Sequence, residues 1–357
     1  MTALTRSVTG SRTVVEVPPA LRTWVTDRIL APVTFVLLVV AIGSVVVRLT
    51  GTTIPMAVQL VPFAISILVF GLPHGALDHL VPARLRPGTG TWTSIAVVVV
   101  LYLVVGTVTA ALWAVAPLAG FVVFIGITWF HWGQGDLYVD RLLDDGASGR
   151  LGASLTVAVR GALPMVLPFV AHPGATVLVI ASTTRAVGGS GPASIPVAAR
   201  IGGALLVLAL VVLHLVVVHR SGAPVWRQAV EDVTLVLFFA AVPPVLAVGL
   251  YFTLWHSVRH VLRLELTDER SAVQLHRGRL LAPFLRFMRQ AWPITAVAVA
   301  MLVVLALVLR RADLGVYLAL IAALTTPHAV VVTWMDHVQH TWRRHATITT
   351  TTGTEPR

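Results

Sequence analysis

The stretch Gly71-Leu72-Pro73-His74-Gly75-Ala76-Leu77-Asp78-His79 ends a long apolar run and places histidines and a carboxylate at its end. The run itself, residues 53–73, has about the 20 residues that a helix needs to cross the hydrocarbon core of a bilayer. A charged side chain at that depth costs about 2.5 to 3.5 kcal/mol on insertion scales, so ionisable residues there are interpreted as functional. The stretch therefore predicts a membrane-spanning fold with a site inside it.

The rest of the chain has the composition of an integral membrane protein. Of its 357 residues, 57% are hydrophobic and only 11% are charged, whereas about 25% charged residues are usual in a soluble domain. Further apolar runs lie near residues 29–49, 92–115, 195–218, 290–309 and 314–335, and more broken ones lie at 117–132, 153–182 and 230–256. We expect an all-α polytopic membrane bundle of about eight to ten transmembrane helices.

The domain organisation expected is a single transmembrane catalytic domain at residues 29–345. A disordered cytoplasmic N-terminus at 1–28 precedes it, and a disordered, Thr-rich tail at 346–357 follows it. The net charge of +11 comes from arginines in the loops between apolar runs. That distribution follows the positive-inside rule and argues against a nucleic-acid partner. It predicts a multi-pass protein of the plasma membrane with its N-terminus in the cytoplasm.

The number of crossings depends on two apolar stretches that prolines interrupt. Residues 153–182 contain several prolines, and residues 230–262 are about 50 Å long as a helix, which exceeds one crossing. One of these stretches must contain an extra crossing or a re-entrant turn if His256 is to reach the same membrane side as the earlier histidines. The break at Pro243-Pro244 is the first candidate.

Three later polar stretches also place histidines at the ends of apolar runs. They are Trp129-Phe130-His131-Trp132-Gly133-Gln134-Gly135-Asp136, Trp255-His256-Ser257-Val258-Arg259-His260 and Thr326-Pro327-His328. Residues four apart share one helix face, so His256 and His260 can reach a single ion. The alternative for this pair is a helix end at the membrane interface. Arg259 lies on another face and is expected to extend to the interface.

Asp78 lies four residues after His74 and is expected to accept the free ring N–H of that histidine, as carboxylates beside metal-binding histidines do. The alternative is that Asp78 and His79 form only the cytoplasmic mouth of the helix. His328 is either a further polar group of the same site or a packing histidine. The aromatic residues expected to line a substrate pocket beside the site are Trp129, Phe130, Trp132, Phe252 and Trp255.

The chain contains no cysteine, so a metal must be held by His, Asp or Glu. An all-imidazole site suits Fe, Zn, Cu or Ni. A site buried in lipid has poor access to water and good access to dissolved O₂. A site of four histidines holding Fe(II) with an open position therefore fits oxidation of an apolar molecule better than hydrolysis.

The four motifs resemble those of the Brp/Blh family of membrane β-carotene 15,15′-dioxygenases, from the second apolar run to the last. The resemblance implies a non-haem Fe(II) enzyme that cleaves β-carotene with O₂ at its central double bond, giving two all-trans-retinal molecules. It implies that the four ligands are His74, His131, His256 and His260, with Asp78, Asp136 and His328 beside them. It also suggests a functional link to a retinal-binding rhodopsin. Trp132 stands where phenylalanine is common in the family.

Two other classes of protein compete with this interpretation. A transporter, or a carotenoid- or retinal-binding protein, could use the histidines as a polar path, although a transporter more often shows paired, similar halves. The second alternative is a di-iron membrane desaturase or hydroxylase, which would need about eight clustered histidine or carboxylate ligands. The motifs described above supply only four or five such ligands.

Overall fold

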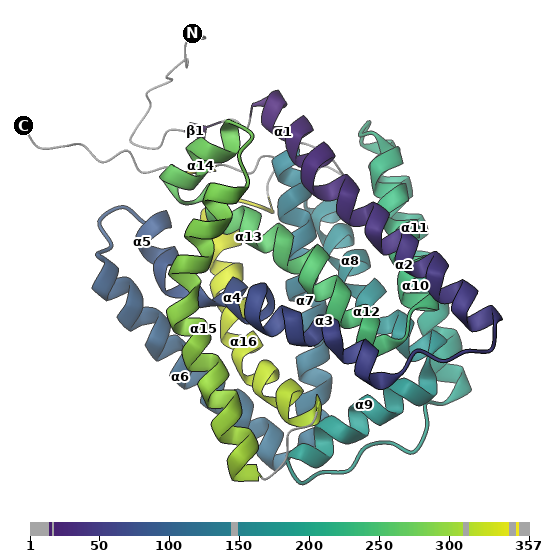
Figure 1. The fold of residues 1–357 in the computed structure, drawn as a ribbon. Coiled ribbons are helices and arrows are strands. Elements are labelled where there is room, and N and C mark those ends of the chain that lie inside the picture. The colour runs from purple at the N-terminus through teal and green to yellow at the C-terminus, as the bar shows by residue number, and fades with distance from the viewer. Residues whose placement is uncertain (1–13, 16–17, 144–148, 310–313, 343–347, 350–357) are drawn as a thin grey trace, which may run out of the picture.

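The computed structural model describes residues 14–15, 18–143, 149–309, 314–342 and 348–349. The helices are α1 (Pro19–Val25), η1 (Thr26–Leu30), α2 (Ala31–Leu49), α3 (Met56–Val69), α4 (Gly71–Ala76), η2 (Asp78–Leu80), α5 (Val81–Leu85), α6 (Thr91–Val115), α7 (Pro117–Leu143), α8 (Gly149–Ala171), α9 (Pro173–Ala186), α10 (Val197–Arg220), α11 (Val225–Ala241), α12 (Pro244–Leu250), η3 (Tyr251–His256), α13 (Ser257–Leu266), α14 (Glu269–His276), α15 (Leu281–Leu309) and α16 (Leu314–Val338). Two short strands, β1 (Val14–Val15) and β2 (Ile348–Thr349), pair antiparallel. Figure 1 shows the helices packed into one bundle.

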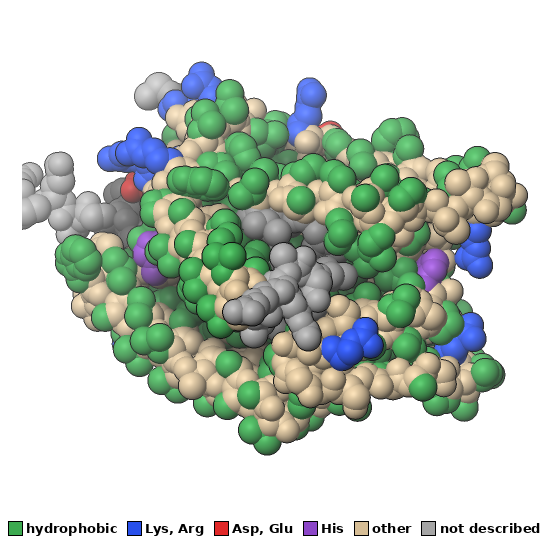
Figure 2. All heavy atoms as spheres, turned by 60° about the horizontal axis from the view of Figure 1, so that its bottom comes forward, with side chains coloured by type: hydrophobic (Ala, Val, Ile, Leu, Met, Phe, Trp, Pro, Cys, Tyr) green, Lys and Arg blue, Asp and Glu red, His purple; other side chains and the backbone are tan. Residues whose placement is uncertain are grey.

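Six helical segments of the described chain are long and apolar enough to cross a membrane. Their bounds are Pro19–Leu49, Thr91–Val115, Gly149–Ala171, Val197–Arg220, Pro244–Leu266 and Leu281–Val308. The face of the molecule in Figure 2 is covered mainly by hydrophobic side chains and carries few charged ones, as contact with lipid chains requires. The predicted all-α polytopic membrane bundle is confirmed, whereas the exact number of crossings stays a prediction.

The first long helix begins at Pro19 and not at residue 29. Residues 19–28 are predicted to be disordered, but α1 and η1 are helical and continue into α2. Leu21, Val25 and Ile29 recur every fourth residue and are buried against α7 and α13. Polar and charged residues separate these three apolar residues, which therefore form a stripe along one helix face and not a continuous apolar run. Most of the predicted disordered tail at 346–357 lies outside the described residues.

Both of the proline-interrupted stretches are divided into separate helices. α8 ends at Ala171 just before α9, and α11 ends at Ala241 just before α12. Proline removes a backbone donor and restricts the residue before it, which explains both breaks. The predicted break at Pro243-Pro244 is therefore confirmed. It begins the separate candidate span Pro244–Leu266, on which His256 and His260 lie.

The apolar run at 53–73 is also divided. α3 ends at Val69, Phe70 has φ −130° and ψ −38°, and the short α4 follows. Figure 1 shows α4 in the middle of the bundle. At this break the carbonyl of Phe70 accepts from the backbone N–H of His74 at 3.0 Å, and the first turn of α4 places the carbonyl of Gly71 beside the His74 ring.

α7 and α8 approach each other so closely that two contact points require glycine. A Cβ at Gly133 would overlap the backbone of Val157, and one at Gly161 would overlap the backbone of Trp129. Small residues allow this kind of close packing between helices in a membrane. The contact fixes the position of α7, the helix that carries His131.

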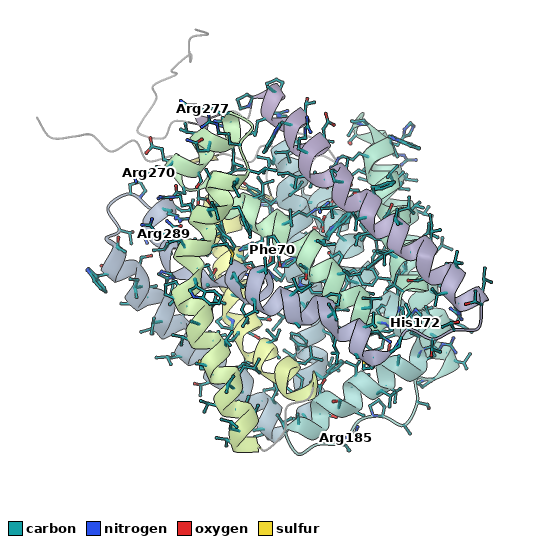
Figure 3. All side chains as sticks on the ribbon, viewed as in Figure 1. Phe70, His172, Arg185, Arg270, Arg277 and Arg289 are labelled. Atoms are coloured by element: carbon teal, nitrogen blue, oxygen red, sulfur yellow. The ribbon has the colours of Figure 1, made fainter. Side chains whose placement is uncertain are left out.

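Basic side chains gather at one end of the bundle. Figure 3 shows Arg270, Arg277 and Arg289 near the end where α13 meets α14, and Arg185 near the opposite end. Arg270 and Arg277 belong to the segment that separates two candidate spans, Pro244–Leu266 and Leu281–Val308, and Arg289 lies near the start of the second span. The bundle is therefore asymmetric in charge along its long axis.

Candidate metal centre

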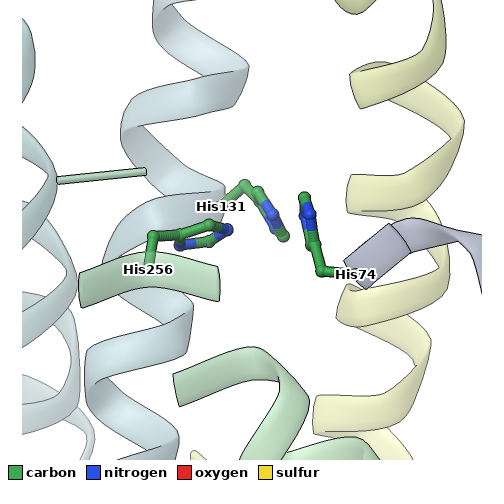
Figure 4. Close-up of side chains that lie close together, drawn as sticks. All are labelled: His74, His131 and His256. Carbon is green, nitrogen blue, oxygen red and sulfur yellow. The ribbon is translucent and has the colours of Figure 1, made fainter. Parts of the chain in front are cut away.

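Five buried histidines from distant parts of the chain meet inside the bundle. They are His74 of α4, His131 of α7, His256 at the end of η3, His260 of α13 and His328 of α16. The ring centroids of eight pairs among them lie 4.8 to 6.4 Å apart. Figure 4 shows how the rings of His74, His131 and His256 converge from three segments. The fold thus brings the four predicted ligands together and adds His328 to them.

The nitrogen atoms of this cluster fit a metal ion. One potential ligand atom from each of His74, His131 and His256 lies within 4.8 Å of the other two, and Asp78, His260 and His328 form a second such group. Within the described part of the chain, the Nε2 atoms of His131, His256, His260 and His328 are buried and have no hydrogen-bond partner. Buried polar atoms are rarely left unsatisfied, and imidazole is a common ligand of transition metals. The cluster is therefore compatible with a metal site.

A π-helical turn presents two of these histidines. η3 ends at His256, and α13 continues directly from it to His260. Short π-helical segments within α-helices are frequent at functional sites. The two rings stack with their centroids 6.4 Å apart and their planes at 10°, so the predicted shared helix face is confirmed.

Hydrogen bonds determine which ring nitrogen stays free in two of the histidines. Nδ1 of His74 donates to the carbonyl of Gly71 at 2.5 Å, and Nδ1 of His328 donates to Oδ2 of Asp78 at 2.7 Å. The same carboxylate oxygen accepts a hydrogen bond from the Tyr102 hydroxyl at 2.7 Å. Because a carbonyl or a carboxylate can only accept, Nε2 of both histidines keeps its lone pair.

The predicted pairing of Asp78 with His74 is therefore wrong. The carbonyl of Gly71, in the first turn of the same short helix, takes the ring N–H of His74. Asp78 instead serves His328, which lies 250 residues away in the sequence. His79 lies beside the cluster and its Nδ1 donates to the carbonyl of Ala76 at 2.8 Å.

Asp136 of α7 contacts Trp255 and Arg259, the residues next to His256 and His260, and so fixes the segment that carries these two histidines to α7. Its carboxylate accepts a hydrogen bond from Nε1 of Trp255 at 3.0 Å and forms an ion pair with Nε of Arg259 at 3.0 Å. The Arg259 guanidinium also lies 3.6 Å above the Trp255 ring. Arg259 is buried, so the expectation that it extends to the interface is wrong, because acidic partners inside the bundle stabilise its charge.

Sequence reasoning missed a larger set of buried charges next to this contact. Arg160 of α8 forms ion pairs with Glu231 at 3.0 Å and Asp232 at 3.2 Å, both on α11. Glu231 also lies 3.4 Å from Arg259, and Asp232 lies 2.8 Å from Nδ1 of His214. The available signal was the occurrence of Arg160, Glu231 and Asp232 inside or beside apolar runs, where ionisable residues need partners.

A second set of polar contacts joins the three helices that carry His131, His260 and His328. Asp336 of α16 forms an ion pair with Arg263 of α13 at 2.7 Å and accepts a hydrogen bond from Gln134 of α7 at 2.8 Å. Arg263 also donates to Gln339 at 2.8 Å. These contacts hold α7, α13 and α16 in a fixed mutual position.

An apolar cavity of about 740 Å³ adjoins the cluster, and His74, His131 and His328 line part of its wall. The cavity also reaches Leu103 of α6 and Val297 of α15. These side chains are 65% and 57% exposed on the outside of the bundle. The cavity therefore opens sideways between α6 and α15.

Two of the five aromatic residues predicted to line a pocket do so, namely Trp132 and Phe252. Trp129 instead donates to the carbonyl of Ala158 at 2.8 Å, Phe130 stacks on Trp342, and Trp255 binds Asp136. The reason is helical geometry, because successive residues point about 100° apart around a helix axis. Neighbouring aromatic residues on α7 therefore cannot all face one cavity.

The fold and the site together define a class: a polytopic helical membrane protein with a buried histidine centre beside an apolar cavity. Comparison with known sequences agrees with this class. The sequence model of the family described as β-carotene 15,15′-dioxygenase matches residues 65–336. The chain belongs to the β-carotene 15,15′-dioxygenase family.

Two relatives from Halobacterium salinarum illustrate the similarity. The probable β-carotene 15,15′-dioxygenase Blh is 40% identical over 306 residues, which cover 82% of this chain and 88% of the relative. The probable β-carotene 15,15′-dioxygenase Brp is 28% identical over 320 residues, with the same two coverages. No solved structure gives a significant match.

Proposed function

We propose that this protein is a membrane dioxygenase that cleaves β-carotene with O₂ at the central 15,15′ double bond and produces two all-trans-retinal molecules. The observation that carries the proposal is the histidine cluster in the wall of an apolar cavity of about 740 Å³. A hydrocarbon substrate needs such a cavity, because it offers no polar group for recognition. The name of the relative that is 40% identical supports the same reaction.

We assign the metal as Fe(II), with His74, His131, His256 and His260 as its ligands. The donor set is imidazole without thiolate, which suits iron. Nε2 of His131, His256 and His260 has no partner among the described residues, and Nε2 of His74 keeps its lone pair because Nδ1 carries the ring proton. When bound, Fe(II) would supply the redox chemistry with O₂ that protein side chains lack.

The protein's own residues would bind the polyene and select one of its double bonds. The rings of Trp132 and Phe252 stack with centroids 6.0 Å apart, and Phe252 lies edge-on to His74 with centroids 5.2 Å apart. These rings restrict where a flat conjugated chain can lie next to the histidines, and positioning of this kind contributes strongly to catalysis. The apolar cavity wall also keeps water away from the reacting bond.

The proposal includes the path of the substrate and the orientation of the protein. β-Carotene would enter from the bilayer through the opening between α6 and α15. The Arg-rich end of the bundle would face the cytoplasm under the positive-inside rule, with the N-terminus on that side of the plasma membrane. We place the activity in one catalytic domain, which extends the predicted range 29–345 to begin at Pro19, and expect the retinal product to serve a retinal-binding rhodopsin.

The test is expression in bacteria that accumulate β-carotene. We expect loss of the orange colour and appearance of retinal in the extract, both abolished by His256→Ala. His219→Ala is the matched control, because His219 is an exposed histidine at the end of α10, and it should cleave as the parent protein does. Persistent colour with the well-expressed parent protein in iron-replete cells would refute the proposed activity.

A further inference from the structure

We propose that His328 is a fifth ligand of the metal centre and that Asp78 and Tyr102 position it. This inference rests on the proposed metal centre and deepens it. The sequence alone gives His328 no definite role, because it follows a proline in an apolar run and has no second histidine on its helix turn. Three independent features of the fold assign it to the donor set.

The first feature is the spacing of the rings. A metal–nitrogen bond is about 2 Å long, and the ring centroid lies about 1 Å beyond the nitrogen. Two imidazoles on one ion therefore have ring centroids about 4 to 4.5 Å apart when the nitrogen–metal–nitrogen angle is about 90°, and about 6 to 6.5 Å apart when it is about 180°. The ring of His328 lies 4.9 Å from that of His74, 4.8 Å from that of His131 and 5.0 Å from that of His260. These distances are near the value for ligands at adjacent positions, so His328 is as close to the group as the predicted ligands are to one another.

The second feature is the state of the two ring nitrogens of His328. Nδ1 donates to Asp78, whereas Nε2 is buried and has no partner within the described residues. This is the arrangement of a metal-binding histidine, in which a carboxylate takes the ring N–H and the other nitrogen binds the ion. Another buried histidine of this chain provides a contrast. His214 also pairs with a carboxylate, Asp232 at 2.8 Å, but its Nε2 lies 3.3 Å from the Thr156 hydroxyl.

The third feature is the support of the carboxylate. Oδ2 of Asp78 accepts from Tyr102 and from His328 at 2.7 Å each, so one oxygen joins η2, α6 and α16. A further polar contact of α16, Asp336 with Arg263 at 2.7 Å, fixes the same helix to α13. The His328 ring is thus held from two sides, as a rigid ligand requires.

A five-imidazole centre has a consequence for the reaction. The five imidazoles would hold the ion, which would supply redox chemistry with O₂ that protein side chains lack. The hydrocarbon substrate would lie in the adjoining cavity, where apolar contacts hold it. Asp78 and Tyr102 act through His328 and are positioning residues.

The test uses the full-length, metal-free protein in detergent and Co(II) as the probe. Co(II) has visible absorption bands that become more intense as the coordination number falls, so the spectrum reports ligand loss independently of activity. The variants are His328→Ala, Asp78→Asn and Tyr102→Phe. His214→Gln is the matched control, because it removes a buried, carboxylate-paired histidine outside the cluster. Size-exclusion chromatography and circular dichroism establish that each variant is folded.

We expect the parent protein to bind one Co(II) per chain. His328→Ala should weaken Co(II) binding by about 100-fold, intensify the absorption bands and regain the parent spectrum when imidazole is added. Asp78→Asn should weaken binding about 10- to 100-fold, as changes beside metal-binding histidines do, and Tyr102→Phe should weaken it less. His214→Gln should bind Co(II) with the parent affinity.

The outcomes separate this inference from the proposed metal centre. If His256→Ala abolishes binding but His328→Ala keeps the parent affinity and spectrum, His328 is not a ligand and the inference is overturned, while the centre stands. If the parent protein itself binds no Co(II) or Fe(II), the proposed centre fails together with the inference. If Tyr102→Phe and Asp78→Asn leave the affinity unchanged while His328→Ala does not, the positioning role is refuted.

Discussion

Replacing Arg259 with methionine should lower the free energy of unfolding by about 3 to 5 kcal/mol, the usual cost of removing one partner from a buried ion pair. Arg259 and Asp136 are only 1% and 3% exposed, and their ion pair measures 3.0 Å. After the change, Asp136 would keep the hydrogen bond from Trp255, but that bond compensates only part of a buried charge, about 1.5 to 3 kcal/mol. Methionine retains an unbranched side chain next to the Trp255 ring, so lost packing adds little.

The double variant isolates the electrostatic part of this loss. Asp136→Asn removes the charge that Arg259→Met leaves unpaired and keeps an oxygen that can accept from Trp255. The double variant should therefore be more stable than the sum of the two single losses predicts, by about 1 to 3 kcal/mol. Glu231 does not confuse the comparison, because it keeps its 3.0 Å ion pair with Arg160 in every variant.

The assay is reversible unfolding in mixed micelles with an increasing fraction of sodium dodecyl sulfate, followed by circular dichroism. Arg270→Met is the matched control, because Arg270 is exposed on α14, and its effect should stay within about 0.5 kcal/mol. A loss below about 1 kcal/mol for Arg259→Met, or strictly additive losses in the double variant, would refute the view that this buried pair holds α13 against α7.

Two further predictions concern the lateral opening and the acid stability. Leu103→Trp should obstruct the opening between α6 and α15, which should raise KM for β-carotene in micelles several-fold with little change in kcat. Val97 lies on the same helix but outside the cavity lining, so Val97→Trp should leave KM unchanged. Equal KM values in the two variants would contradict the lateral path. Burial alone would raise the pKa of Asp268, but hydrogen bonds from Arg286 and the Ser271 N–H, with the charge of Arg84, lower this pKa from its ordinary 3.8. Asp268 therefore contributes stability above pH 3.8 that is lost as the pH falls through its lower folded-state pKa. The difference in unfolding free energy between the parent protein and Asp268→Asn should be constant above pH 3.8 and shrink below it. A difference that grows on acidification would contradict the assignment.

The membrane fold and the main histidines could be predicted because their signals are local. Long apolar runs follow directly from the thickness of the bilayer, and the four-residue spacing of His256 and His260 follows from the helix period. The break at Pro243-Pro244 could be predicted for the same reason, because proline acts on its immediate neighbours.

The partners of the histidines could not be predicted, because they depend on contacts between distant segments. Asp78 is four residues from His74 and 250 from His328, yet it binds the more distant one. The ring N–H of His74 binds the carbonyl of Gly71 on its own short helix, which leaves the carboxylate for another ring. Likewise, Arg259 inside the bundle and Arg259 at the interface give the same sequence pattern, and only the acidic groups on α7 and α11 decide between them.

Within the cluster, His74 and His328 differ in how far mutation can adjust their hydrogen-bond partners. The ring N–H of His74 binds a main-chain oxygen, which every amino acid at position 71 would present alike. The ring N–H of His328 binds a side-chain carboxylate, and exchanging that group for an amide or a hydroxyl would weaken the electron donation from the opposite ring nitrogen in steps. Natural variation and protein engineering can therefore tune the donor strength of the His328 imidazole one substitution at a time, whereas that of His74 is fixed by the course of the backbone.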